Sequence, residues 1–167
     1  MKRIWAPWRM KYITGEAQKK KDGCIFCLKP MQRNDQRNLI ILRGKAAFVI
    51  MNLFPYNNGH LMVAPYRHVG DFAGLTDPEL LEMMKLAQSC QQAIARTMRP
   101  DGFNLGFNLG RTAGAGIADH LHLHLVPRWN GDTNFMPVLG DTKVVSEALE
   151  DSYRKIKKAL GHRGGKK

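Results

Sequence analysis

The sequence lacks any apolar stretch near the roughly 18–20 residues that a membrane-spanning helix requires. Its basic N-terminus is not followed by the apolar segment of a secretory signal peptide. Only three of its 167 residues are cysteines, which is too few for a disulfide scaffold. These absences predict a cytoplasmic protein that does not act in a membrane, and the length suits one globular domain with a hydrophobic core.

Acidic residues are also scarce, because 14 Asp and Glu stand against 26 Lys and Arg, a formal net charge of +12. Such a balance favours anionic partners, which include nucleotides, phosphate and nucleic acid. Much of the positive charge lies in short runs near the two termini, where charged side chains are usually solvated. We therefore expect a polyphosphate partner and do not expect nucleic acid on the basis of charge alone.

Histidine, in contrast, is concentrated at one place. Three of the six histidines, His120, His122 and His124, alternate with leucine within five residues. A period of two is that of a β-strand, so the imidazoles share one face and the leucines the other. The leucines can enter a core, whereas three adjacent imidazoles each need polar partners. Such a row suits metal binding, proton transfer or nucleophilic attack; the alternative is an exposed strand face that happens to carry histidine.

Alternating apolar residues, separated by turn-forming residues, predict five strands. They cover residues 38–43, 46–53, 60–64, 103–110 and 120–126. The last two are expected to pair antiparallel, which would place Asn108 near the imidazoles. Thr76 as a cap and Glu79 three positions later predict the start of a long helix. The apolar face of this helix is expected to hold Leu80, Met83, Met84, Ala87, Cys90 and Ile94.

Cys24 and Cys27 have the Cys-x-x-Cys spacing of a metal-binding knuckle or a redox pair. Cys90 falls on the predicted long helix and is expected to be a small core residue. Two cysteines alone do not complete a metal site, so distant histidines would have to supply the remaining ligands of a tetrahedral zinc ion. Two ordinary reduced thiols are the alternative interpretation.

The pattern His-φ-His-φ-His-φ-φ over residues 120–126, where φ is apolar, follows a glycine-rich loop at residues 111–116. This combination resembles the histidine triad family, whose members transfer or hydrolyse nucleotides at the α-phosphate. The resemblance extends from about Cys24 to Trp129. The flanking segments 5–10, 124–129 and 131–135 are similar to one branch of that family, the bacterial diadenosine tetraphosphate phosphorylases.

The resemblance implies an α+β histidine triad fold, with an antiparallel sheet of about five strands, one long helix and a C-terminal helix. It divides the chain into an N-terminal arm (1–21), a histidine triad domain (22–140), a C-terminal helix packed on that domain (141–160) and a basic tail (161–167). A homodimer is expected by the same resemblance.

The resemblance also implies roles for individual residues. His122 is the nucleophile, and an imidazole with a pKa near 6.5 is largely neutral at pH 7. His124 and Asn108 bind the phosphates or the leaving group. Asn52 aligns with a ribose-binding position, although a turn residue at the end of a strand is the alternative.

In the loop before the triad, the backbone amides of Gly114 and Gly116 are expected to form an anion nest. Gly116 and Ile117 stand where many hydrolases of the family have Gln followed by Ser or Thr. Two phosphate-contacting side chains are therefore absent, which favours the phosphorylase branch. His124 argues against the relatives with Gln in the third triad position, including the hexose-phosphate uridylyltransferases.

Some family members bind zinc through the first triad histidine and a histidine that follows a strand ending in proline. Here these residues are His120 and His68. Together with Cys24 and Cys27 they would form a structural zinc site, because four protein ligands leave no position for a catalytic water. No organic cofactor is expected.

The sequence thus predicts nucleotidyl transfer from a dinucleoside polyphosphate to phosphate through adenylylated His122, with adenine nucleotides as ligands. The first alternative is a dinucleoside polyphosphate or nucleoside phosphoramidate hydrolase. The second is a nucleotide- or nucleic-acid-binding module with an idle triad. A third, a catalytic zinc hydrolase, needs a nearby carboxylate base, and strand alternation turns Asp119 to the opposite face.

Overall fold

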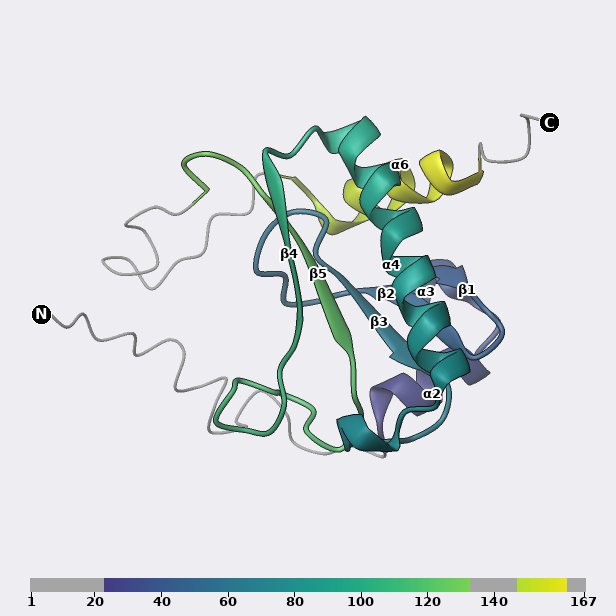
Figure 1. Ribbon diagram of the computed structural model, residues 1–167. Helices are drawn as coiled ribbons and strands as arrows, with labels where there is room; N and C mark the ends of the chain where they lie inside the picture. The colour runs from purple at the N-terminus through teal and green to yellow at the C-terminus, as the bar shows by residue number, and fades with distance from the viewer. Residues whose placement is uncertain (1–22, 133–146, 162–167) are drawn as a thin grey trace, which may run out of the picture.

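The computed structural model describes residues 23–132 and 147–161 (Figure 1). The predicted arm, nearly all of the basic tail and the first residues of the predicted C-terminal helix lie outside these ranges. None of the helices within the two described ranges is long and apolar enough to cross a membrane.

A five-stranded antiparallel sheet forms the centre of the molecule, which confirms the predicted α+β class (Figure 1). Its order is β1-β2-β3-β5-β4, so β1 and β4 are the edges. The strands are β1 (Ile40–Arg43), β2 (Ala47–Met51), β3 (Leu61–Pro65), β4 (Gly102–Phe107) and β5 (Leu123–Arg128). The strand that carries His124 therefore lies between β3 and β4, where its backbone is held on both sides.

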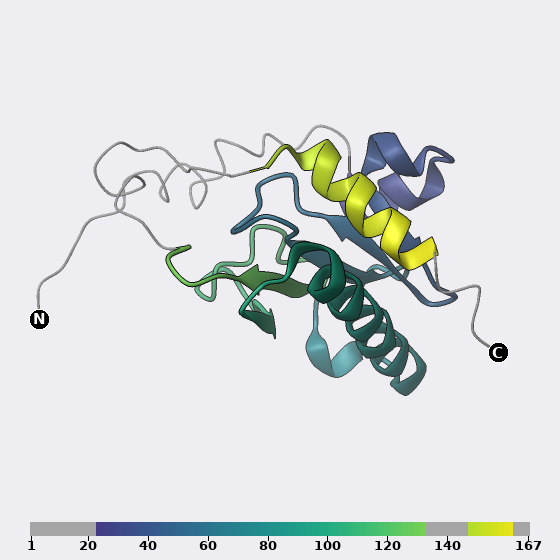
Figure 2. The same cartoon turned by 90° about the horizontal axis from the view of Figure 1, so that it is seen from above.

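Helices cover the two faces of the sheet unequally. The long helix α4 (Asp77–Met98) and the C-terminal helix α6 (Leu149–Gly161) lie beside each other (Figure 2). Both contribute to the larger core, whereas the short helix α2 (Ile25–Met31) contributes Phe26 to a smaller core on the other face. A second short helix, α3 (Asp35–Asn38), precedes β1, and a 3₁₀ turn, η1 (Phe72–Gly74), precedes α4.

The alternation of the triad segment matches these two cores. Leu121, Leu123 and Leu125 are buried in the larger core with α4 and α6. The strand itself, however, begins at Leu123 and not at His120 as predicted. The register places Val63 opposite Leu123, so further along β3 Ala64 would face His122 and Pro65 would face Leu121, and Pro65 has no amide hydrogen to donate. The Leu121 N–H instead donates to the carbonyl of Val69 at 2.8 Å.

Helix α4 begins after Thr76 and ends before Arg99, as predicted, but one residue of its predicted apolar face is exposed. Met84 is 51% exposed, because the buried side of the helix runs through Met83 and Ala87 and position 84 lies outside it. The buried side also includes Leu86 and Ala93, which the prediction omitted. A period of 3.6 residues accommodates these positions on one side and turns position 84 towards solvent.

The N-terminus of α4 is tied to the loop after β3 by one carboxylate. Glu79 accepts hydrogen bonds from the N–H and the hydroxyl of Thr76, both at 2.9 Å, and from Arg67 at 2.7 Å. The hydrogen bond from Arg67 is the largest contribution that lowers the pKa of Glu79, to about 2. Glu79 thereby fixes both the start of α4 and the residue next to His68.

Replacing Glu79 by glutamine should make the protein less stable at pH 7 and less sensitive to acid. Because the folded-state pKa lies below the ordinary value of about 4.5, this carboxylate stabilises the fold above pH 4.5 and stops doing so as the pH falls towards 2. Glu79→Gln should lower the free energy of unfolding at pH 7 by about 1–3 kcal/mol. Urea denaturation between pH 2 and pH 7 measures both effects.

Asp77→Asn, in the same first turn but on an exposed side chain, is the matched control and should change stability much less. Equal losses in the two variants, or an unchanged acid dependence in Glu79→Gln, would contradict this account of the helix start.

Candidate functional site

The three triad histidines lie in two different environments. His120 faces Cys24, Cys27 and His68, whereas the rings of His122 and His124 lie against each other with centroids 4.8 Å apart. All three are buried, with no more than 7% of each residue exposed. The segment therefore joins a candidate metal centre to a candidate reaction centre.

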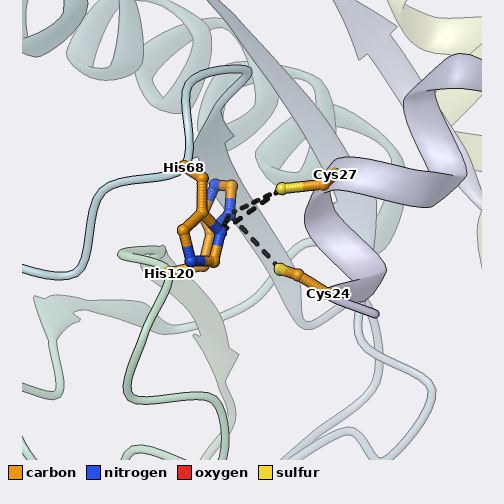
Figure 3. A group of neighbouring side chains, drawn as sticks. All are labelled: Cys24, Cys27, His68 and His120. Atoms are coloured by element: carbon orange, nitrogen blue, oxygen red, sulfur yellow. Dashed lines mark hydrogen bonds between the residues drawn. The ribbon is translucent and has the colours of Figure 1, made fainter. Parts of the chain in front are cut away.

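The candidate metal centre brings together four residues that are distant in sequence (Figure 3). Cys24 is the N-cap of α2 and Cys27 lies in its first turn, while His68 follows β3 and His120 precedes β5. One donor atom from each residue lies within 4.8 Å of the others. Sequence analysis named these four residues but did not predict the helix that presents both thiols to the same point.

The separations between the donor atoms suit a tetrahedral ion. Nδ1 of His120 lies 3.4 Å from Sγ of Cys24, 3.5 Å from Sγ of Cys27 and 3.3 Å from Nδ1 of His68. Sγ of Cys27 lies 3.4 Å from the same nitrogen of His68. A tetrahedral zinc ion with usual Zn–S and Zn–N distances separates its ligand atoms by about 3.3–3.8 Å.

The tautomer of His120 also suits a metal ligand. Its Nε2–H donates to the carbonyl of Pro65 at 2.9 Å, which leaves the lone pair on Nδ1. A backbone carbonyl behind the ring is the usual outer partner of a metal-bound histidine. Burial lowers the pKa of His120, which favours the neutral ring that binds a metal. Burial raises the pKa of the Cys27 thiol, so zinc binding would have to displace the thiol proton, as it does at cysteine ligands in general. The residues present therefore fit zinc.

In the candidate reaction centre, a backbone carbonyl selects the nitrogen of His122 that is available for reaction. Nδ1 of His122 lies 2.9 Å from the carbonyl oxygen of His120, so Nδ1 carries the proton and Nε2 the lone pair. Burial lowers the pKa of His122, and the ring is neutral at pH 7. The ring packs on Phe26 of α2 with centroids 4.8 Å apart. The result is a neutral imidazole whose orientation is fixed.

His124 is oriented by a histidine outside the triad. The N–H of Tyr56 donates to Nδ1 of His60 at 3.0 Å, so the proton of the neutral His60 ring is on Nε2. That nitrogen lies 2.9 Å from Nδ1 of His124, which therefore accepts, and His124 carries its own proton on Nε2. Burial, followed by the charge of His122, lowers the pKa of His124 to about 4. His124 thus presents a neutral ring with an N–H donor.

Two asparagines named from the sequence lie beside these histidines. Nδ2 of Asn108, just beyond β4, is 3.4 Å from Nε2 of His124, close to the imidazoles as the predicted strand pairing implied. An amide nitrogen only donates, so the Nε2–H tautomer of His124 requires the Asn108 amide to be turned, with Oδ1 towards this N–H. Asn52 follows β2, where its Oδ1 accepts from the N–H of Phe54 at 3.0 Å and its Nδ2 lies 3.4 Å from Nδ1 of His60. The ribose-binding role of Asn52 stays a prediction.

The glycine-rich loop differs in part from the predicted anion nest. The N–H of Gly114 donates to the carbonyl of Arg111 at 2.9 Å, and that of Ala115 to the carbonyl of Gly110 at 3.3 Å. Gly114 adopts a φ of +93°, which closes this turn. The Gly114 amide is therefore used within its own loop and does not point to a ligand, whereas the role of Gly116 stays a prediction.

Sequence reasoning missed three contributors to the site. Phe26 is fully buried and packs on the rings of both His120 and His122. The Tyr56 ring stacks on His124, with centroids 5.6 Å apart and planes 17° apart. The contact of His60 with His124 is the third, and the sequence did not indicate it. In the sequence, only their positions point to these two aromatic residues. Phe26 lies between the two cysteines, and Tyr56 precedes the Gly-His pair at residues 59–60.

The catalytic-zinc alternative is not favoured by this arrangement. Within residues 23–132 and 147–161, the candidate metal group includes one triad histidine, His120, and neither His122 nor His124. Asp119, the carboxylate nearest in sequence, is exposed. The candidate metal centre and the pair His122–His124 thus have no side chain in common.

The comparisons with known proteins agree with this geometry. The family model described as "HIT domain" matches residues 33–131, more than half of the chain. The AP-4-A phosphorylase of Mycobacterium tuberculosis is 43% identical over 160 residues, which cover 92% of this chain and 82% of that protein.

Solved structures give the same result. A zinc-bound histidine triad family protein from Mycobacterium smegmatis matches with a TM-score of 0.67 and 25% identity, over 84% of this chain and 94% of that chain. A hypothetical histidine triad nucleotide-binding protein from Sulfolobus tokodaii, 24% identical, matches with a TM-score of 0.65 over 83% and 93% of the two chains. With its buried triad, its five-stranded sheet and these matches, the chain belongs to the histidine triad family.

Proposed function

We propose that the protein transfers a nucleotidyl group from a dinucleoside polyphosphate to phosphate through a covalent intermediate on His122, with diadenosine tetraphosphate as substrate and ATP and ADP as products. The observation that carries the proposal is the 2.9 Å hydrogen bond from Nδ1 of His122 to the carbonyl of His120, which leaves a neutral nucleophile at Nε2. The 43% identity to an AP-4-A phosphorylase supports the choice of substrate.

The first step replaces a phosphoanhydride bond by a phosphorus–nitrogen bond. Nε2 of His122 attacks the α-phosphorus, the bond from that phosphorus to the bridging oxygen breaks, and the electron pair leaves on ATP. In the second step an oxygen of inorganic phosphate attacks the same phosphorus, breaks the bond to His122 and forms ADP. Covalent catalysis of this kind divides one difficult displacement into two easier ones.

In this proposal His124 and Asn108 act on the phosphate oxygens. The N–H at Nε2 of His124 can donate to a non-bridging or leaving oxygen, and the Asn108 amide adjoins that nitrogen at 3.4 Å. Because both histidine rings are buried, a hydrogen bond to a developing negative charge is stronger there than it is in water. In this proposal Asn52 binds the ribose and Gly116 contributes a backbone amide to the phosphates.

The identity of the acceptor rests on the loop before the triad. Gly116 and Ile117 present no hydroxyl or amide side chain to the phosphates, unlike the hydrolase-type members of the family. This difference and the phosphorylase relative favour phosphate over water as the acceptor. A hydrolase with the same first step is the second candidate, and a nucleotide-binding module without turnover is the third.

We also propose that zinc occupies the centre formed by Cys24, Cys27, His68 and His120. The ion would supply no chemistry to the reaction and would crosslink α2 to the segments that precede α4 and β5. Four protein ligands leave no position for a water molecule, so the role is structural. The zinc-bound relative from Mycobacterium smegmatis supports the choice of metal.

A homodimer is the assembly that we propose. Strand β4 is an edge of the sheet. Leu105 on this strand is 45% exposed, and Leu109, two residues beyond its end, is 50% exposed. An apolar edge of this kind is a common place for a second copy to pair or pack.

Trapping tests the nucleophile. When the protein is mixed with labelled diadenosine tetraphosphate in the absence of phosphate and denatured without acid, one labelled adenylyl group should remain on His122. His122→Ala should lose activity by a factor on the order of 10³ or more and still bind nucleotide. His162→Ala, a histidine outside the triad, is the control and should be fully active. Unchanged turnover in His122→Ala would exclude the mechanism.

Product analysis tests the acceptor. With diadenosine tetraphosphate and isotopically labelled phosphate, we expect turnover to depend on phosphate and the label to appear in ADP and not in ATP. The reverse reaction, in which ATP and ADP form the dinucleotide and phosphate, should also be measurable because both steps exchange similar anhydride bonds. ATP and AMP as the main products in excess phosphate would favour the hydrolase, and no turnover would favour the binding module.

Metal analysis tests the zinc centre. Protein purified without chelator should contain about one zinc per chain, and Cys24→Ser or His68→Ala should release it and lower the melting temperature. Since zinc binds thiolates, its apparent affinity should rise with pH. Cys90→Ala is the matched control, because that buried core cysteine should affect stability without affecting zinc content. Metal-free protein of full stability would support two ordinary thiols.

A further inference from the structure

The carboxylate of Asp132 collects hydrogen bonds at the end of the strand that carries His124. Its Oδ2 accepts from Nδ2 of Asn57 at 2.7 Å, from Nε of Arg128 at 2.6 Å and from the N–H of Trp129 at 3.1 Å. Its Oδ1 accepts from Nη2 of Arg128 at 2.8 Å. Only 8% of the Asp132 side chain is exposed, although the residue lies in a surface turn. This buried carboxylate therefore accepts four hydrogen bonds from three residues.

One of these donors belongs to a different loop, the one that delivers His60. The Asn57 amide donates to the carbonyl of Pro127 at 3.1 Å as well as to Asp132, and its Oδ1 accepts from the N–H of Asn58 at 3.2 Å. These partners fix which end of the amide is nitrogen and which is oxygen. The backbone carbonyl of Asn57 accepts from the N–H of His60 at 3.1 Å. Asn57 therefore joins Asp132 to the turn that ends at His60.

The turn leaves little room for His60 to move. Gly59 adopts a φ of +72°, and a Cβ at this position would lie 3.0 Å from Sδ of Met98 and 3.4 Å from Cγ of Pro127. His60 itself is fully buried, and both of its ring nitrogens have assigned partners, the Tyr56 N–H and Nδ1 of His124. The tautomer of His124 consequently depends on where this turn places His60.

We propose that Asp132 is a positioning residue for nucleotidyl transfer, which, through Asn57, holds His60 against Nδ1 of His124 and thereby keeps the N–H of His124 on Nε2, facing the substrate phosphate. This role rests on the proposed function of His124. Asp132 lies one position beyond the residues that the family model matches, 33–131, so the family pattern itself does not include it. Arg128 completes the arrangement by pairing with the carboxylate and, through Nη1, with Oδ1 of Asn104 on β4 at 2.8 Å.

The substitution Asp132→Asn tests this role. An amide in place of the carboxylate turns one acceptor into a donor, which then opposes the Asn57 amide, the Trp129 N–H or Arg128. Asp101→Asn is the matched control, because Asp101 accepts from the N–H of Asn130 in the same turn at 2.8 Å and no contact joins it to Asn57 in the described part of the chain. Circular dichroism and thermal unfolding of both variants establish that each is folded.

Two measurements follow, one of which needs no turnover. Long-range ¹H–¹⁵N NMR of the imidazoles should show protonated Nε2 and unprotonated Nδ1 for His124 in the parent and in Asp101→Asn, and a mixture of tautomers in Asp132→Asn. In single-turnover experiments, the rate of adenylyl transfer to His122 should fall about tenfold or more in Asp132→Asn and be unchanged in Asp101→Asn. A purely structural role would lower the melting temperature without changing the tautomer.

An unchanged His124 tautomer in folded Asp132→Asn overturns the inference, and so does an unchanged rate of adenylyl transfer. If Asp132→Asn does not fold, Asn57→Ala removes the same link from the other loop and should give the same tautomer mixture. If the parent forms no adenylyl-His122, the proposed function fails, and the NMR comparison of the two aspartate variants still decides whether Asp132 controls the tautomer of His124.

Discussion

A single hydrogen bond within the triad segment, from Nδ1 of His122 to the carbonyl of His120, determines the chemistry that this site can perform. Without it, the proton of a neutral imidazole would exchange between the two nitrogens, and the lone pair would face the site only part of the time. Residues 120–122 precede β5, and Pro65, which would face Leu121, has no N–H with which to extend the ladder between β3 and β5. A proline on the neighbouring strand thus lies where the triad segment departs from the sheet, in contact with the residue whose carbonyl orients His122.

The same backbone turn gives His120 two functions. Its carbonyl orients His122, while its ring points to the two cysteines and His68 and is held from behind by the carbonyl of Pro65. A displacement of the His120 backbone would therefore act on both the candidate metal ligand and the carbonyl that accepts from His122. The metal centre and the reaction centre therefore share one residue, although their other side chains are distinct.

Local sequence patterns predicted the parts of this fold that are determined by interactions between residues close in the sequence. Leu121, Leu123 and Leu125 occupy the larger core because a strand alternates its faces, and Thr76 with Glu79 begins α4 because that pair satisfies the free amides of a helix end. The residues named for the metal centre came from a family resemblance combined with the Cys-x-x-Cys spacing, and the structure brings these four donors together.

The remaining contacts depend on pairs that are far apart in the sequence, and no local pattern indicates them. His60 and His124 are 64 positions apart and Asn57 and Asp132 are 75 apart, and the antiparallel pairing of β3 with β5 brings the segments that carry them together. The start of the triad strand was also predicted three residues too early. Residues 120–122 continue the alternation of histidine and leucine, but they have no hydrogen-bonded partner strand in the described sheet, and the sequence does not show this. Periodicity predicts which face of a strand each side chain lies on. It does not predict where hydrogen bonding to the neighbouring strand ends.

His122 and His124 each pack against an aromatic ring from another part of the chain. Helix α2, anchored by Cys24 and Cys27, places Phe26 on His122, and the loop before β3 places Tyr56 on His124. Both imidazoles are buried, and burial is the principal cause that keeps them neutral by lowering their pKa values. A neutral pair with fixed tautomers, one with a free lone pair and one with a free N–H, needs little reorganisation when a phosphate enters, which is how a preorganised site lowers a barrier. The positive net charge of the chain can then attract the polyphosphate without placing a cation between the two rings.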